Sequence, residues 1–302
     1  MLRAAVFMIA SAWAFAAPAP TLLRHTVPAA AVVAGVRVTD VRDTAFGRFL
    51  LKEFAGEGPE FENFVKATGF DPRRDIQELL YSAPVGDGWL IAARGTFPAD
   101  RLIMLGKLAG AEITPVQGIQ MVNTAKAAAS PLGKPMAFAF LDANTAVAGD
   151  ERSVRQAITR RRIAGGPAPQ MATRATQLAG VWPAWFVAND FSMISGSTPL
   201  SSGMQKMVQR ASGGFRFGDT VGLNAELIAR TVNDAKTLAE FLRFLSKAGE
   251  GATDPQAAAI AQMLSTAEVS VAATSVKIGL TIPESVLEAF VTESRLEEPA
   301  GP

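Results

Sequence analysis

Residues 71–75 form the most polar cluster of the chain. Asp71 and Asp75 are four residues apart, so a helical turn would place both carboxylates on one face. Paired carboxylates can serve as general acid and base, as they do in many hydrolases. Arg73 and Arg74 lie between them, however, and a neighbouring guanidinium lowers a carboxylate pKa, which disfavours a general acid. We therefore interpret the cluster as a capped helical turn neutralised by its own arginines, with a carboxylate-dependent hydrolase as the alternative.

A second polar cluster consists of arginines. Its members are Arg152, Arg155, Arg160, Arg161 and Arg162. Arginines can bind phosphates or a polyanion through paired hydrogen bonds. Acids at the start of a helix and bases at its end are also what the helix dipole favours, and Asp150 and Glu151 precede these arginines. No flanking aromatic residues offer a stacking surface for bases. A solvated helix end is the preferred interpretation, and a polyanion-binding patch the alternative.

An aromatic cluster precedes a polar segment at 192–203. Trp182 and Trp185 are followed by Asn189 and Asp190, which could supply polar contacts. Aromatic residues beside long loops are common in carbohydrate and partner sites, although packing into the core is the more frequent role. This region is our first choice for a binding surface.

The composition removes many other kinds of chemistry. The chain has 302 residues, no cysteine and one histidine, His25, in the leader region. Disulfides, thiolate nucleophiles and Cys or His zinc sites are therefore excluded, and we find no P-loop, G-x-S-x-G or calcium-loop motif. We expect no metal and no cofactor. Lys and Arg total 29 against 28 Asp and Glu, so nothing in the overall charge indicates a nucleic-acid partner.

The first residues are typical of an export signal. Arg3 precedes an apolar stretch over 4–15, and residues 14–16 read Ala-Phe-Ala, a pattern that signal peptidase accepts. The apolar stretch is shorter than the roughly 20 residues that span a bilayer. We expect a cleaved signal at 1–16, a linker at 17–26, no transmembrane segment in the mature chain, and a periplasmic or extracellular location.

Hydrophobic spacing predicts an α+β fold. Alternating apolar residues indicate hairpins over 76–94, 113–122, 136–148, 215–227 and 269–282. Apolar residues at helical spacing predict helices between them, for example Leu238, Phe241, Leu242 and Leu245. Asp71 and Asp150 precede predicted helices as N-caps. Helices that return across antiparallel hairpins would cover one sheet face and leave the other free.

The same order of hairpins and helices occurs twice. We expect two tandem related modules, at 27–165 and 171–294, joined by a Gly- and Pro-rich linker at 166–170 and followed by a tail at 295–302. The pattern suggests an internal duplication. It does not indicate whether the two halves share one sheet.

Two stretches resemble an uncharacterised family of exported bacterial proteins. One is Gly-Phe-Asp-Pro-Arg-Arg-Asp at 69–75, and the other is Phe-Leu-Asp at 140–142 followed by Ala-Val-Ala-Gly-Asp at 146–150. The resemblance implies export and an α+β fold. It implies no activity and no catalytic residues.

We therefore expect a non-enzymatic exported protein that binds a partner protein or an envelope ligand, such as a glycan. The alternatives are an exported hydrolase that uses Asp71 and Asp75, and a polyanion-binding protein that uses the arginines of 152–162.

Overall fold

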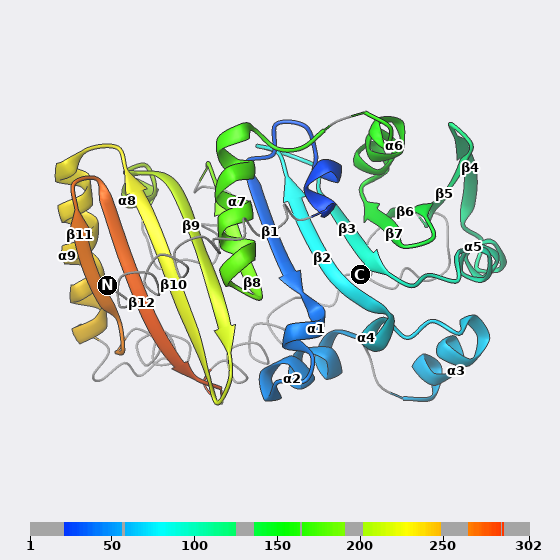
Figure 1. The fold of residues 1–302 in the computed structure, drawn as a ribbon, viewed down its shortest axis with the longest axis horizontal. Coiled ribbons are helices and arrows are strands. Elements are labelled where there is room, and N and C mark those ends of the chain that lie inside the picture. Colours follow the sequence, from blue (N-terminus) through cyan, green and yellow to red (C-terminus); the bar gives the residue numbers. More distant parts are fainter. Residues whose placement is uncertain are drawn as a thin grey trace, which may run out of the picture.

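The protein has an α+β fold built on one antiparallel sheet (Figure 1). The computed structural model describes residues 21–55, 58–124, 136–163, 165–190, 202–248, 265–284 and 286. Within these ranges the sheet has 12 strands in the order β11-β12-β10-β9-β8-β1-β2-β3-β7-β6-β5-β4. The expected signal at 1–16, the tail at 295–302 and most of the polar segment at 192–203 lie outside the described residues.

The elements have these bounds. The strands are β1 Val32–Arg37, β2 Ile76–Ala83, β3 Leu90–Gly95, β4 Glu112–Val116, β5 Ile119–Asn123, β6 Ala137–Asp142, β7 Thr145–Gly149, β8 Ala184–Ala188, β9 Val208–Phe217, β10 Thr220–Ala229, β11 Glu268–Ala272 and β12 Ser275–Pro283. The helices are the 3-10 helix η1 Thr21–His25, then α1 Val38–Val41, α2 Ala45–Ala55, α3 Pro59–Thr68, α4 Pro72–Asp75, α5 Ala99–Leu108, α6 Glu151–Arg160, α7 Pro169–Val181, α8 Ser202–Gln205 and α9 Val232–Ala248.

The expected hairpins and N-caps are confirmed. Each predicted pair of strands forms an antiparallel ladder: β2 with β3, β4 with β5, β6 with β7, β9 with β10, and β11 with β12. The Asp71 side chain accepts a hydrogen bond from the backbone N–H of Arg73 at the start of α4. The Asp150 side chain accepts one from Ser153 at the start of α6. These features depend on neighbouring residues, which is why sequence spacing predicts them.

The two halves of the chain share one continuous sheet. Strand β1 pairs with β2 on one side and with β8 on the other, so that Gly35 lies opposite both Leu80 and Trp185. Each half begins with three consecutive paired strands, and a later strand then returns to pair with the third: β7 with β3, and β12 with β10. This parallel agrees with an internal duplication, which stays a prediction, as does the division into two modules.

One face of the sheet carries η1, α6 and α7, and we call it the front face. Figure 1 shows α7 in front of β8 and beside β1, running along the strands on this side. The apolar stripes of α6 and α7 pack with alternate residues of β1 to β8 in one buried cluster. Leu22 and Leu23 of η1 belong to that cluster and are at most 6% exposed. Residues 21–25 are therefore part of the core, and not of the linker expected at 17–26, because their apolar side chains fill space over β2 and β3.

The opposite, back face is also covered by helices. Helix α5 packs on it at one end, where Gly106 lies against Val122 and Phe138. Helix α9 packs on it at the other end through Leu238 and Leu242. The expectation that helices would leave one face free does not hold for the sheet as a whole, because apolar residues of the first half point to both faces and both are covered. In the second half, α9 covers the back face, and no helix among the described residues covers the front face beyond α7.

An apolar hollow of about 330 Å³ lies on the back face between these two helices, over β1, β2, β8 and β9. Tyr81, Phe186 and Phe215 are among the residues that line it. Because its lining side chains are almost all apolar, this hollow offers little to orient a polar ligand.

The front face of the second half is polar. Beyond α7, the side chains that alternate onto this face of β9, β10, β12 and β11 include Ser212, Asn224, Glu226, Lys277 and Ser270. No helix of the described part of the chain is long and apolar enough to cross a membrane.

Candidate functional site

Trp182 closes one end of a groove beside α7. Its backbone N–H donates to the carbonyl oxygen of Leu178 at 2.8 Å, which ends the helix and turns the chain toward β8. The indole packs over Gly214 of β9, where a Cβ atom would overlap the ring. The Arg216 guanidinium lies over the same indole, with its Cζ 5.1 Å from the ring centroid. Helix end, glycine and guanidinium together hold the indole against the sheet.

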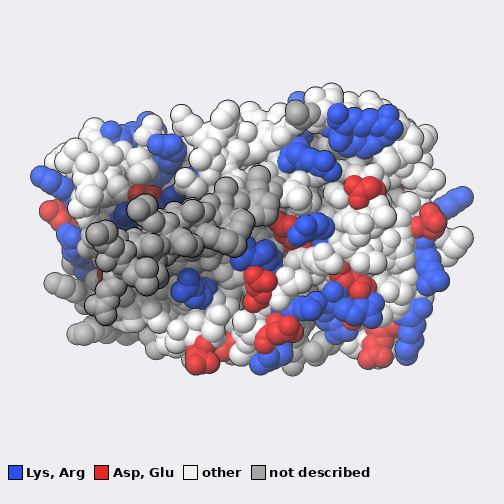
Figure 2. Space-filling view, viewed as in Figure 1, with Lys and Arg blue, Asp and Glu red and all other residues white. Residues whose placement is uncertain are grey.

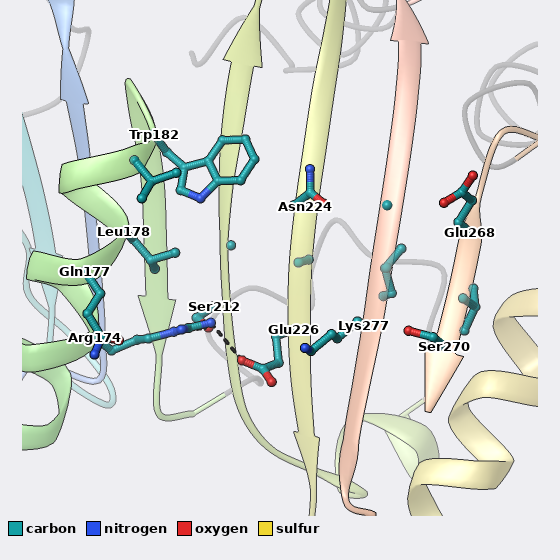
Figure 3. Close-up of a pocket in the computed structure, with 16 residues that line it drawn as sticks. Arg174, Gln177, Leu178, Trp182, Ser212, Asn224, Glu226, Glu268, Ser270 and Lys277 are labelled. Carbon is teal, nitrogen blue, oxygen red and sulfur yellow. Dashed lines mark hydrogen bonds and ion pairs between the residues drawn. The ribbon is translucent and has the colours of Figure 1, made fainter. Parts of the chain in front are cut away.

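Two rows of residues form the floor of this groove. In the first row, Ser212, Glu226, Lys277 and Ser270 lie opposite one another on β9, β10, β12 and β11. In the second row, the residues on the same four strands are Gly214, Asn224, Gly279 and Glu268. Paired residues of an antiparallel sheet point to the same face, so both rows face α7. Figure 3 shows Trp182 and Asn224 at one end and Arg174, Ser212, Glu226 and Lys277 at the other.

The resulting α7 groove has a volume of about 620 Å³. We define it by Arg174, Trp182, Asn224, Glu226, Glu268 and Lys277, which are among the residues that line it. Small-ligand sites commonly have volumes of roughly 300–1,000 Å³ and contain a few convergent polar groups. The groove meets both conditions.

Arg174 bridges the helix and the sheet. Its Nη2 lies 2.7 Å from Oε2 of Glu226, and its Nε donates to Oγ of Ser212 at 3.0 Å. The Ser275 hydroxyl donates to the other carboxylate oxygen of Glu226 at 2.7 Å. Glu226 is thus fixed by partners from two other elements, α7 and β12, and it presents a partly exposed carboxylate to the groove.

A smaller groove of about 200 Å³ lies on the other side of this ion pair. Asn189 and Arg210 line it, together with Arg174, Ser212 and Glu226, which also line the α7 groove. The Arg174–Glu226 pair therefore separates two hollows along the same helix.

The four candidate residues of the aromatic cluster, Trp182, Trp185, Asn189 and Asp190, do not form one site in the structure. Trp182 lines the α7 groove and Asn189 the smaller groove. Trp185 is 4% exposed and packs over Gly35 in the core under α7. Asp190 is half-buried after the end of β8 and lines neither groove.

Each acid of the Asp71–Asp75 pair has its own arginine. The Arg73 guanidinium makes two hydrogen bonds to Asp71, each 2.9 Å long, and the Arg74 guanidinium makes bonds of 2.7 and 2.9 Å to Asp75. Asp75 also accepts the backbone N–H of Asp71 at 2.8 Å. Hydrogen bonds from these arginines lower the pKa of both carboxyl groups. This geometry gives no support to an acid–base role.

The arginines of 152–162 have separate local partners. Figure 2 shows basic side chains gathered where Figure 1 places α6. Arg155 pairs with Glu151 at 2.7 Å, and Arg161 donates to the carbonyl oxygen of Gln117 at 2.8 Å. Arg160 donates to the carbonyl oxygen of Thr26 at 3.0 Å, and burial lowers the pKa of its guanidinium. Arg152 and Arg162 are exposed. The helix presents a mixed surface in which several arginines tie it to neighbouring segments.

The two stretches that resemble the exported family have structural roles. Gly69 ends α3 in the left-handed conformation, with φ of 75°. Gly149 lies so close to the carbonyl of Trp89 that a Cβ atom would overlap it. Asp150 accepts the backbone N–H of Trp89 at 2.8 Å as well as that of Ser153. The family resemblance itself stays a prediction.

Sequence reasoning missed most of the α7 groove. Arg174, Asn224, Glu226, Glu268 and Lys277 come from four elements up to about a hundred positions apart. One feature of the sequence did indicate the groove floor. Polar residues and glycine alternate with apolar residues along 210–216, 222–226 and 277–281. That pattern indicates a sheet with one polar and one apolar face.

No family model and no curated protein matches the chain. A solved structure titled "Structure of crystal form I of TP0453" is similar in fold, with a TM-score of 0.53 and 9% sequence identity. The match covers 90% of this chain and 96% of that chain. At this identity the similarity concerns the fold alone, and folds host many unrelated functions.

Proposed function

We propose that this chain is a non-enzymatic exported protein that binds a partner protein or an envelope ligand in the α7 groove. The observation that carries the proposal is the groove itself. It has about 620 Å³ of space, it is bounded by Trp182, and polar side chains project from its floor between two glycines. Aromatic groups with a few convergent polar groups are the usual composition of a binding site.

The rigidity of the site supports this proposal. The floor strands β9, β10 and β12 each have a strand on both sides, and the apolar side of α7 is buried against β8. Side chains on such a framework are already positioned before a ligand arrives, which reduces the entropy that binding would cost.

Export is supported by sequence features. The expected signal at 1–16 and the absence of cysteine are consistent with a protein that folds in an oxidising compartment. The test is N-terminal sequencing of the protein from the envelope fraction. We expect the mature chain to begin at Ala17, and recovery of the uncleaved chain from the cytoplasm would contradict export.

Binding is tested by capture from an envelope fraction, comparing the native protein with Gly279→Leu. A Cβ atom at Gly279 has its nearest neighbours at 3.9 Å, so the fold accepts a side chain there, but a leucine would fill the groove floor. The control is Gly222→Leu, at a glycine on the same face of β10 that does not line the groove.

We expect the same envelope component to be recovered with native protein and with Gly222→Leu, and to be lost with Gly279→Leu. Equal recovery with all three proteins would exclude the α7 groove as the site. Recovery of a polyanion that depends on Arg152 and Arg162 would favour the polyanion alternative instead.

A further inference from the structure

The ligand-facing groups of the α7 groove are side chains and not backbone. Strands β9, β10 and β12 are interior strands, so their backbone N–H and C=O groups face neighbouring strands. An extended peptide that binds by strand addition needs the free backbone groups of an edge strand. The three inner strands of the floor do not offer them. Strand β11 is the edge strand of the described sheet, and its free backbone groups lie on the side that points away from β12 and from the groove.

The charges that line the groove balance. Arg174 and Glu226 are joined in an ion pair, and exposed Lys277 is accompanied by exposed Glu268 on the neighbouring strand. Two cations and two anions give the lining itself no net charge, and Arg216 adds a cation at the rim, over the Trp182 indole. The lining therefore has no strong preference for a ligand of one sign.

The groove offers both hydrogen-bond donors and hydrogen-bond acceptors. Asn224, Gln177 and Ser270 carry both donors and acceptors, Lys277 only donates, and Glu268 only accepts. A sugar hydroxyl likewise donates one hydrogen bond and accepts others.

One end of the groove has an aromatic and aliphatic wall. The Trp182 indole and Val181, which is 58% exposed, form that wall. Gly279 leaves an open space on the floor between Asn224 and Glu268. A ligand with a C–H face and a rim of hydroxyls would meet both the wall and the floor.

We infer that the ligand of the α7 groove, in the function proposed above, is an uncharged saccharide chain. Its ring C–H groups pack beside Trp182, and its hydroxyls bond to Asn224, Lys277 and Glu268 over Gly279.

The experiment titrates the mature protein with neutral trisaccharides (chitotriose, cellotriose and maltotriose) and, in parallel, with the zwitterionic peptide trialanine and the acidic peptide triglutamate. Binding is followed calorimetrically and through the indole N–H signal of Trp182 in NMR spectra, which is assigned with Trp182→Phe. We expect at least one trisaccharide to shift that signal with an affinity that does not change with salt, since an uncharged ligand releases no ions.

Variants locate the site and identify the chemistry. Asn224→Ala should weaken trisaccharide binding by about tenfold or more, which corresponds to losing one or two good hydrogen bonds. Gly279→Leu should weaken it at least as much, because the leucine would fill the groove floor. Gly222→Leu should leave the affinity unchanged. Lys277→Met should weaken trisaccharide binding about as much as Asn224→Ala, because it removes one contact to a hydroxyl, and that loss should not change with salt. A loss that becomes smaller as salt rises would indicate an anionic ligand.

The outcomes distinguish this inference from the proposed function. If none of the trisaccharides binds, or if only a peptide binds and does so more weakly as salt rises, the saccharide inference is overturned. The proposed function survives that result when capture from the envelope still depends on Gly279. The proposed function is contradicted independently if Gly279→Leu captures the same envelope component as the native protein.

Discussion

The indole of Trp182 occupies the space in which a side chain at residue 214 would lie. Gly214 has no Cβ, and the ring packs over its Cα with Arg216 on the same strand 5.1 Å from the ring centroid. Gly214 is buried between Trp185 on β8 and Asn224 on β10. This relationship joins the end of α7 to the sheet and sets where the α7 groove begins.

Gly214→Ala should displace the indole. The added Cβ would overlap Trp182, so we expect a loss of about 1–3 kcal/mol in the free energy of unfolding and a change in the near-UV signal of tryptophan. Urea denaturation measures the first and circular dichroism the second. Gly222→Ala is the matched control, because its Cβ would have its nearest neighbour at 4.0 Å. Equal stability of the two variants would show that the packing of the Trp182 indole does not require a glycine at residue 214.

His25 should make stability depend on pH between about 6.5 and 4. Burial, and then the nearby charge of Arg24, lower the pKa of this imidazole from 6.5 to about 4. The ring is neutral in the folded protein and accepts a hydrogen bond from Nε of Arg24. Because the unfolded chain takes up the proton first, the stabilisation is complete above pH 6.5 and is lost as the pH falls toward 4. The loss amounts to about 3 kcal/mol.

The histidine prediction has a direct measurement, because the chain contains one histidine. Its ring signals in NMR spectra should titrate near pH 4. The His25→Gln variant should lose the slope of stability between pH 6.5 and 4. Titration near pH 6.5, or the same slope in the variant, would contradict a buried neutral ring.

Asp150→Ala should destabilise the protein at neutral pH by about 1–3 kcal/mol, because two backbone N–H groups, those of Trp89 and Ser153, lose their acceptor. Partial burial raises the pKa of this carboxyl, but hydrogen bonds from Ser153 and from the backbone outweigh it and lower the pKa below its usual range. The stabilisation is therefore present above about pH 4 and is lost as the pH falls through the folded-state pKa.

Urea denaturation of the native protein and Asp150→Ala at pH 7 and at pH 3 measures this difference. The gap between the two proteins should be smaller at pH 3. A gap that does not change with pH would show that the carboxylate charge contributes little. Asp150→Asn, which keeps an accepting oxygen, should recover part of the stability at pH 7.

The Arg174–Glu226 ion pair should contribute little to stability. The two side chains are 37% and 26% exposed, and partly exposed pairs are screened by water and salt. A double-mutant cycle with Arg174→Ala and Glu226→Ala should therefore give a coupling free energy below about 1 kcal/mol. A coupling of several kcal/mol would mean that the pair holds α7 on the sheet.

Local features of this fold were predictable from the chain. The hairpin of β2 and β3, the caps at Asp71 and Asp150, and the apolar stripe of α9 all depend on residues within a few positions of one another. Backbone preferences and side-chain periodicity act over that range. The buried position of η1 was missed because Leu22 and Leu23 find their partners on β2 and β3, more than fifty positions later.

By itself, the sequence determined the α+β class, the strand pairs and the helix ends of this protein, and it excluded thiol chemistry. The tertiary structure decided that β1 pairs with β8 in one continuous sheet, that helices cover both faces, and that Arg174, Glu226 and Lys277 meet in one groove. The physical reason is that a strand has two edges and two faces that periodicity cannot tell apart. Which edge is paired and which face is covered depends on how all the apolar segments of the chain are buried together.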